Sequence, residues 1–132
     1  MDIDISQLKK ETADAVEEAK RDERNKVAKV MEKNARRLKR IESRATDIIE
    51  SIPDKCHEAA KAGMNKAMIM KVKDRMITRN NWSNKLEYTQ LKDEAALVWN
   101  ACMEAKLNPI IRFCHDGVGI TSWFEIWANW GE

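Results

Sequence analysis

Glycine and proline are scarce in this chain, with four glycines and two prolines in 132 residues. So low a content of chain breakers argues against a loop-rich or disordered protein. No apolar run approaches the roughly 18 residues that a membrane span requires, so we expect no membrane segment. The first ten residues lack a cationic stretch followed by an apolar one, and we therefore expect no signal peptide.

Cysteine and histidine are also few, and their positions match no pattern for chemistry. Three cysteines, an odd number without regular spacing, fit reduced cytoplasmic thiols better than disulfides. With two histidines and no Cys-x-x-Cys or His-x-x-x-His spacing, neither a zinc site nor Cys–His catalysis is expected. Cys114 and His115 are neighbours, but neighbours on a strand point to opposite faces. A glycine-rich phosphate loop is missing as well. The sequence predicts no catalytic residues, no metal and no cofactor.

The first half of the chain is dominated by strong helix formers: alanine, glutamate, lysine and arginine. Asp4 and Gln7 have the spacing of a capping box, and the next glycine or proline is Pro53. From residue 27 onward, apolar residues recur in alternating steps of four and three, the 3.5-residue period of a left-handed coiled coil. The predicted seam comprises Val27, Met31, Asn34, Leu38, Ile41, Ala45, Ile48 and Ile52.

This seam predicts self-association of the long helix. Asn34 is its one polar member, and a lone seam asparagine commonly fixes register and oligomer state. A homodimer is the expected assembly, and isoleucine at both kinds of seam position leaves a trimer open. The competing interpretation packs the helix along its own domain, but no other predicted helix is long enough to cover it. A weaker seam lies upstream, beyond the charged stretch 20–24, and comprises Ile5, Leu8, Thr12, Ala15 and Ala19.

Residues 53–132 predict a small α/β domain, which follows a coiled-coil segment, 1–52. Pro53 is expected to interrupt or restart the helix, with a short helix then ending at Gly63. Alternating residues predict a strand at 67–73, and residues 74–85 are predicted as a loop. A helix is predicted over 86–106, with a core stripe at Tyr88, Leu91, Ala95, Val98 and Cys102.

The chain is predicted to end in a β-hairpin, because residues 110–115 and 120–130 alternate around an Asp-Gly turn. The helical crossover between the first two strands favours a parallel arrangement of that pair. The predicted fold class is α+β: a long N-terminal coiled-coil helix followed by an α-β-α-β-β domain with a three-stranded sheet.

The last strand offers a candidate interaction surface. Its more apolar face, which includes Phe124 and Ile126, is assigned to the core. Trp123 and Trp127 then lie side by side on the other face, and tryptophan is enriched at protein interfaces. An equally weighted interpretation has a helix cover that face. Trp82, in the predicted loop, is a third candidate contact for a protein partner.

Charge is unevenly distributed along the long helix. Residues 1–19 carry a net charge of −4 and residues 20–44 a net charge of +7. In zipper-type DNA readers the basic region precedes the seam, whereas here it lies within it. We therefore favour two explanations over nucleic-acid binding. In the first, the basic residues form a solvated face with ion pairs within the helix. In the second, the acidic stretch 1–19 lies against the basic stretch 20–44 of an antiparallel partner. The candidate phosphate contacts of the nucleic-acid alternative are Lys33, Arg36, Arg37, Arg40 and Arg44.

The helix–strand–helix–hairpin order of residues 50–130, with AAKAG at 59–63 and SWFEIWANW at 122–130, resembles small uncharacterised proteins of tailed bacteriophages. The resemblance implies a protein made in the cytoplasm of an infected bacterium, which acts by binding a host or phage macromolecule and not by catalysis. Combined with the seam, it predicts a non-enzymatic, homo-oligomeric interaction protein.

Overall fold

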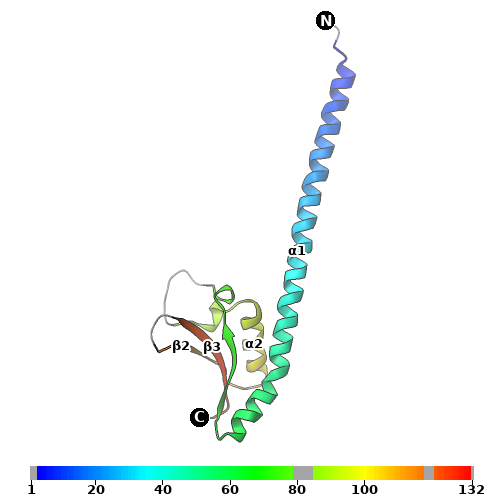
Figure 1. Ribbon diagram of the computed structural model, residues 1–132. Coiled ribbons are helices and arrows are strands. Elements are labelled where there is room, and N and C mark those ends of the chain that lie inside the picture. The colour runs from blue at the N-terminus through cyan, green and yellow to red at the C-terminus, as the bar shows by residue number, and fades with distance from the viewer. Residues whose placement is uncertain (1–2, 79–84, 118–120, 132) are drawn as a thin grey trace. The chain divides into compact units, whose positions relative to one another are not determined.

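The computed structural model describes residues 3–78, 85–117 and 121–131. The chain divides into two compact units, residues 1–39 and 40–132, and the first helix contributes to both. The predicted α+β class is confirmed. In chain order the elements are α1 (Ile5–Lys61), β1 (Lys66–Val72), the 3-10 helices η1 (Asp74–Met76) and η2 (Tyr88–Gln90), α2 (Asp93–Glu104), β2 (Ile110–His115) and β3 (Ser122–Asn129) (Figure 1).

The first unit is the N-terminal part of α1. The helix starts where the sequence predicts, because a carboxylate oxygen of Asp4 accepts a hydrogen bond from the Gln7 N–H at 3.2 Å. Every described residue from 3 to 40 is exposed. Most helices in proteins gain their stability by packing an amphipathic face, and in the single chain this unit packs none.

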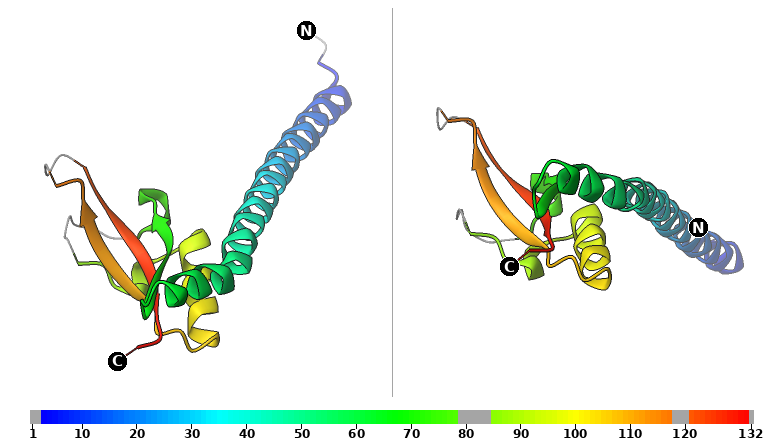
Figure 2. Two further views of the ribbon diagram at one scale, coloured as in Figure 1. Left: turned by 60° about the horizontal axis from the view of Figure 1, so that its bottom comes forward. Right: turned by 90° about the horizontal axis from the view of Figure 1, so that it is seen from below.

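The prediction that Pro53 interrupts the long helix is wrong, because α1 continues through it to Lys61. Proline removes one helical N–H, and packing of Ile52 and Cys56 against the core holds the helix on both sides of it. Figure 2 shows α1 bending in its green part. The predicted stop at Gly63 is confirmed: its φ is +82°, and the N–H of Met64 donates to the Ala59 carbonyl at 3.0 Å.

The sheet has the strand order β1-β3-β2, and β3 pairs antiparallel with both neighbours. The predicted hairpin is therefore confirmed as β2 and β3. β1 and β2 run in the same direction, as the crossover predicts, but β3 lies between them. A bulge between Met68 and Met70 adds Ile69 to β1, and this extra residue is buried.

The core of the second unit lies between one face of the sheet and the helices. Phe124 and Ile126 of β3 are buried there, which confirms the predicted inner face of the last strand. They pack with Val98 and Cys102 of α2 and with Ile52 of α1. Both helices therefore lie on the same side of the sheet (Figures 1 and 2).

The helix predicted over residues 86–106 is shorter than expected. α2 begins at Asp93, whose φ of +57° breaks the helical path, and Tyr88 lies in η2. Tyr88 is exposed, not buried, and its ring stacks on Trp99 at a centroid distance of 5.7 Å. Leu91 is buried as predicted, but in an isolated bridge with Ile77, so burial here follows from strand pairing and not from a helical stripe.

Candidate functional site

A row of three side chains marks the face of the sheet that points away from the core. Trp123, Glu125 and Trp127 follow one another at every second residue of β3, so they share a face. Each indole Nε1–H donates to a different oxygen of the Glu125 carboxylate, both at 3.0 Å. All three residues are half-buried. We call them the Trp-Glu-Trp row.

Cations from the two outer strands lie against the indole rings of this row. The Lys71 ammonium of β1 lies 4.6 Å from the centroid of the Trp123 ring. The Trp127 ring has Lys66 at 5.8 Å and Arg112 of β2 at 5.3 Å. At these distances cations are attracted to the negative face of an indole. The exposed face of the sheet is thus aromatic and basic around one carboxylate.

The carboxylate of Glu125 is held in its charged form. Burial alone would raise the pKa of Glu125, but hydrogen bonds from Trp123, Cys114 and Trp127, together with the charge of Arg112, outweigh it and lower that pKa. Burial and the neighbouring carboxylate raise the pKa of the Cys114 thiol, whose Sγ lies 3.2 Å from Glu125 Oε1. Cys114 is therefore a thiol donor and not an activated nucleophile.

An open groove of about 320 Å³ adjoins Trp127 between the last turns of α1 and β1. The Lys55 ammonium of α1 donates to the Ile69 carbonyl of β1 at 2.6 Å and so joins the two walls of the groove. The groove extends the aromatic face with small apolar side chains. Its lining residues are Lys55, Glu58, Ala59, Ala62, Met64, Lys66, Ala67, Met68 and Trp127.

An ion pair between the exposed Arg75 and the buried Glu94 holds η1 to α2. Arg75 Nη1 donates to Glu94 Oε1 at 3.1 Å, and Nη2 pairs with the other oxygen. Burial alone would raise the pKa of Glu94, but the hydrogen bonds and charge of Arg75 lower it. Glu94 is 1% exposed, and this bidentate pairing accounts for a carboxylate in that position. Its role is structural.

The structure divides the predicted seam into two parts. Val27, Met31 and Leu38 are 53%, 66% and 55% exposed, and Asn34 is exposed too. The later members are covered within their own chain: Ile41, Ala45 and Ile52 are buried, and Ile48 is half-buried. Packing of α1 along its own domain, the weaker interpretation above, therefore holds for residues 41–52. Of the predicted seam, only the members from Val27 to Leu38 are fully exposed in the single chain.

The sequence also predicted tryptophan contacts for a protein partner and basic contacts for phosphate. Trp123 and Trp127 are brought together by Glu125, whereas Trp82 lies outside the described residues. Arg36 forms an ion pair with Glu32, one helical turn earlier. The candidate phosphate contacts Lys33, Arg36, Arg37, Arg40 and Arg44 are all exposed.

Comparison of the chain with known protein families, curated proteins and solved structures finds no match. Within residues 3–78, 85–117 and 121–131, no group of three or more metal-ligating side chains gathers in one place. In the same part of the chain no helix is both long and apolar enough to cross a membrane. The three cysteines are free thiols.

Proposed function

We propose that this protein is a non-enzymatic, homo-oligomeric interaction protein. Its exposed N-terminal helix associates with a copy of itself, and the Trp-Glu-Trp row binds another protein. One observation carries the proposal: mostly apolar side chains recur at coiled-coil spacing in two stretches, residues 5–19 and 27–38, and every described residue of α1 up to residue 40 is exposed in its own chain.

Burial of these exposed side chains favours self-association. Fully burying a leucine, methionine or valine contributes roughly 1.5–3 kcal/mol. Val27, Met31 and Leu38 leave most of this free energy unused in the single chain, because each is more than half exposed. Association of two such helices recovers it and excludes water from both stripes.

The hydrogen-bonded geometry of the Trp-Glu-Trp row favours a protein partner. Both indoles are already oriented by Glu125 and flanked by cations, so binding costs little side-chain entropy. Half-buried tryptophans in such a setting are typical interface anchors. In keeping with the phage resemblance, the proposed partner is a host or phage protein in the cytoplasm of an infected bacterium.

Light scattering on the intact chain tests self-association. We expect a dimer at micromolar concentration and a shift to monomer in Met31→Glu, which places a charge in the seam. Asn25→Glu is the matched control, because it adds the same charge on the opposite side of the helix and should leave the dimer intact. A monomeric intact chain at that concentration would contradict the proposal.

Affinity capture from infected bacteria tests the second surface. We expect Trp127→Ala to lose the partner that the unaltered chain retains. Trp130→Ala is the control, because Trp130 has the same side-chain type, follows β3 directly, is exposed and does not belong to the Trp-Glu-Trp row. Equal capture by both variants would exclude the Trp-Glu-Trp row as the binding surface.

Nucleic acid remains the second candidate partner, because the five candidate phosphate contacts are exposed. It predicts salt-dependent binding to duplex DNA, which is lost when Arg36, Arg37 and Arg40 are replaced by glutamate. Retention of DNA binding in this variant would exclude the basic stretch as its cause.

A further inference from the structure

The strand β2 lies at the outside of the sheet. In the strand order β1-β3-β2 its inner edge pairs with β3, and no strand of the described residues pairs with its outer edge (Figure 1). The outer edge of a sheet is a row of backbone N–H and carbonyl groups that can pair with a further strand. The outer edge of β2 is therefore a candidate interaction surface.

The pairing of β2 with β3 shows which backbone groups lie on this outer edge. The Asp116 N–H donates to the Thr121 carbonyl at 3.1 Å, so these two residues form a hydrogen-bonded pair. Hydrogen-bonded and non-hydrogen-bonded pairs alternate along antiparallel strands. Every second residue before Asp116 therefore turns its N–H and carbonyl toward β3, and the residues between them turn theirs outward. The residues of β2 with outward backbone groups are Ile111, Phe113 and His115.

Phe113 occupies the middle of this edge and is only partly covered. It lies opposite Phe124 in the register, so its side chain is on the core face of the sheet. The two rings pack edge to face, with their centroids 5.4 Å apart. Phe113 nevertheless remains 39% exposed, because it lies at the edge of the sheet. A further strand beside β2 would cover this apolar surface.

A second copy of β2 fits the edge when the two strands run antiparallel around a two-fold axis at Phe113. The axis stands perpendicular to the sheet, so both core faces stay on the same side. Phe113 then lies opposite Phe113 of the copy, and Ile111 lies opposite His115. All the outward residues meet outward residues, which gives three hydrogen-bonded pairs with two bonds each. Contact between the two phenylalanine rings adds to these bonds.

The neighbouring registers are less favourable. An axis at Arg112 places two like charges directly opposite each other, which destabilises a strand pair. An axis at Cys114 sets Arg112 opposite Asp116 of the copy, but it also brings Gly117 into the ladder. Gly117 has a φ of +85°, which ends the strand, so two hydrogen-bonded pairs form in place of three. The axis at Phe113 sets Arg112 opposite the uncharged Cys114.

We infer that the outer edge of β2 binds β2 of a second copy in antiparallel register centred on Phe113, so that two sheets join into one. This contact goes beyond the proposed function, because it uses a surface other than the seam of α1 and does not depend on it. Two such short strands bury less than the roughly 1,200 Å² of a stable interface. The contact therefore forms at concentrations above the micromolar range.

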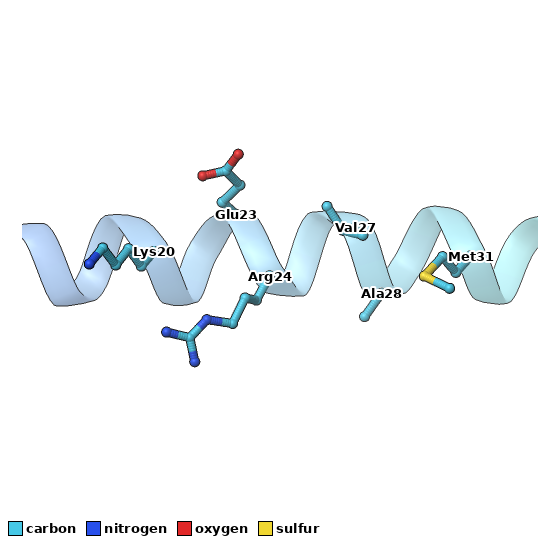
Figure 3. A pocket seen from close by; sticks show the side chains of 6 residues that line it. All are labelled: Lys20, Glu23, Arg24, Val27, Ala28 and Met31. Atoms are coloured by element: carbon cyan, nitrogen blue, oxygen red, sulfur yellow. The ribbon is translucent and has the colours of Figure 1, made fainter.

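Light scattering on full-length variants tests the contact without the seam. Met31→Glu places a charge in the shallow groove of about 450 Å³ on α1 that Met31 lines (Figure 3). Between about 0.01 and 1 mM, this variant should shift from monomer toward dimer. Adding Phe113→Lys sets two lysines opposite each other and should keep the chain monomeric. Tyr88→Lys is the matched control, because it gives another exposed aromatic position the same charge and should retain the dimer.

The outcomes for β2 and for α1 can be told apart. The same behaviour of Phe113→Lys and Tyr88→Lys would overturn the β2 contact, and so would a Met31→Glu protein that stays monomeric up to about 1 mM. Self-association of α1 is measured on the intact chain at micromolar concentration, where the β2 contact is not formed. A monomeric intact chain at that concentration would contradict the seam and leave the β2 contact to the series of variants.

Disulfide trapping tests the register without a lysine at the edge. In the seam variant with Cys56→Ser added, Arg112→Cys places a thiol directly opposite Cys114 of the copy, where a disulfide can form. At about 0.5 mM chain in a glutathione buffer it should form a covalent dimer, whereas the chain that keeps Arg112 should not. Asn100→Cys, at an exposed position of α2, is the control for random collision. A covalent dimer through Cys114 alone would overturn the register, and a yield no higher than the control would overturn the pairing.

Discussion

The two parts of α1 have the same secondary structure and opposite environments. Residues 5–40 are exposed at every described position, whereas Ile41, Ala45 and Ile52 are buried in the second unit. The chain's own core therefore stabilises the end of α1, whereas its beginning packs against nothing in the single chain. A periodic pattern identifies an apolar stripe, but not whether the covering surface belongs to the same molecule.

The largest expected difference between the two units comes from removing an apolar side chain in each. Ile126→Ala empties space in the core and should lower the free energy of unfolding of the second unit by about 2–5 kcal/mol. Leu38→Ala should leave that quantity unchanged and weaken association instead. Urea unfolding followed by tryptophan fluorescence checks this, since all five tryptophans lie in residues 82–130. An equal loss of unfolding free energy in both variants would contradict the view that Leu38 lies outside the core of the second unit.

The ion pair of Arg75 with the buried Glu94 should produce the next largest effect. Arg75→Met leaves Glu94 buried without its partner and should cost about 3 kcal/mol in urea unfolding. Arg75 lowers the pKa of Glu94, so its stabilisation is complete above the ordinary carboxyl pKa and is lost as the pH falls through the lowered value. Unfolding at neutral and acidic pH should therefore show a smaller effect of Arg75→Met in acid.

The Trp-Glu-Trp row should contribute less, because its members are half-exposed. Glu125→Gln keeps one acceptor for two indole donors and removes the charge, with an expected cost of about 1 kcal/mol. The measurement is the free energy of unfolding, with the tryptophan emission spectrum as a local readout. Glu58→Gln, in the adjoining groove, is the control and should leave the spectrum unchanged.

The smallest effect is expected for an ion pair on the first unit. Glu32 and Arg36 lie one helical turn apart, and both side chains are mostly exposed. Glu32→Gln should change helix stability by no more than about 0.5 kcal/mol, as measured by circular dichroism during thermal unfolding. A loss as large as that of Arg75→Met would show that this part of α1 is enclosed by something other than water.

Local patterns in the sequence predicted the features that depend on neighbouring residues. Alternation of apolar and polar residues predicts the strand at 67–73 and the hairpin. The stop at Gly63 follows from the positive φ that glycine adopts at the end of a helix. Pro53 and Tyr88 were predicted wrongly because tertiary contacts decide them: packing carries α1 through Pro53, and the bridge of Leu91 with Ile77 shortens the next helix.

The same distinction applies to the candidate site. The pairing of Trp123 and Trp127 followed from strand parity, and the spacing Trp-x-Glu-x-Trp also placed Glu125 on their face. Its role as a common acceptor could therefore have been found in the sequence. The contacts from Lys71 and Arg112 could not, because they require β3 to lie between β1 and β2. Likewise, Arg75 and Glu94 are nineteen residues apart and meet only in the folded chain.

The bulge in β1 interrupts one outer edge of the sheet. Stacking sheets end to end requires two straight outer edges per molecule, each with free backbone groups. β1 is kinked at Ile69, and the carbonyl of that residue is already taken by Lys55. Because this edge is interrupted, we expect that pairing through the other outer strand would join two molecules and would not propagate into a fibre.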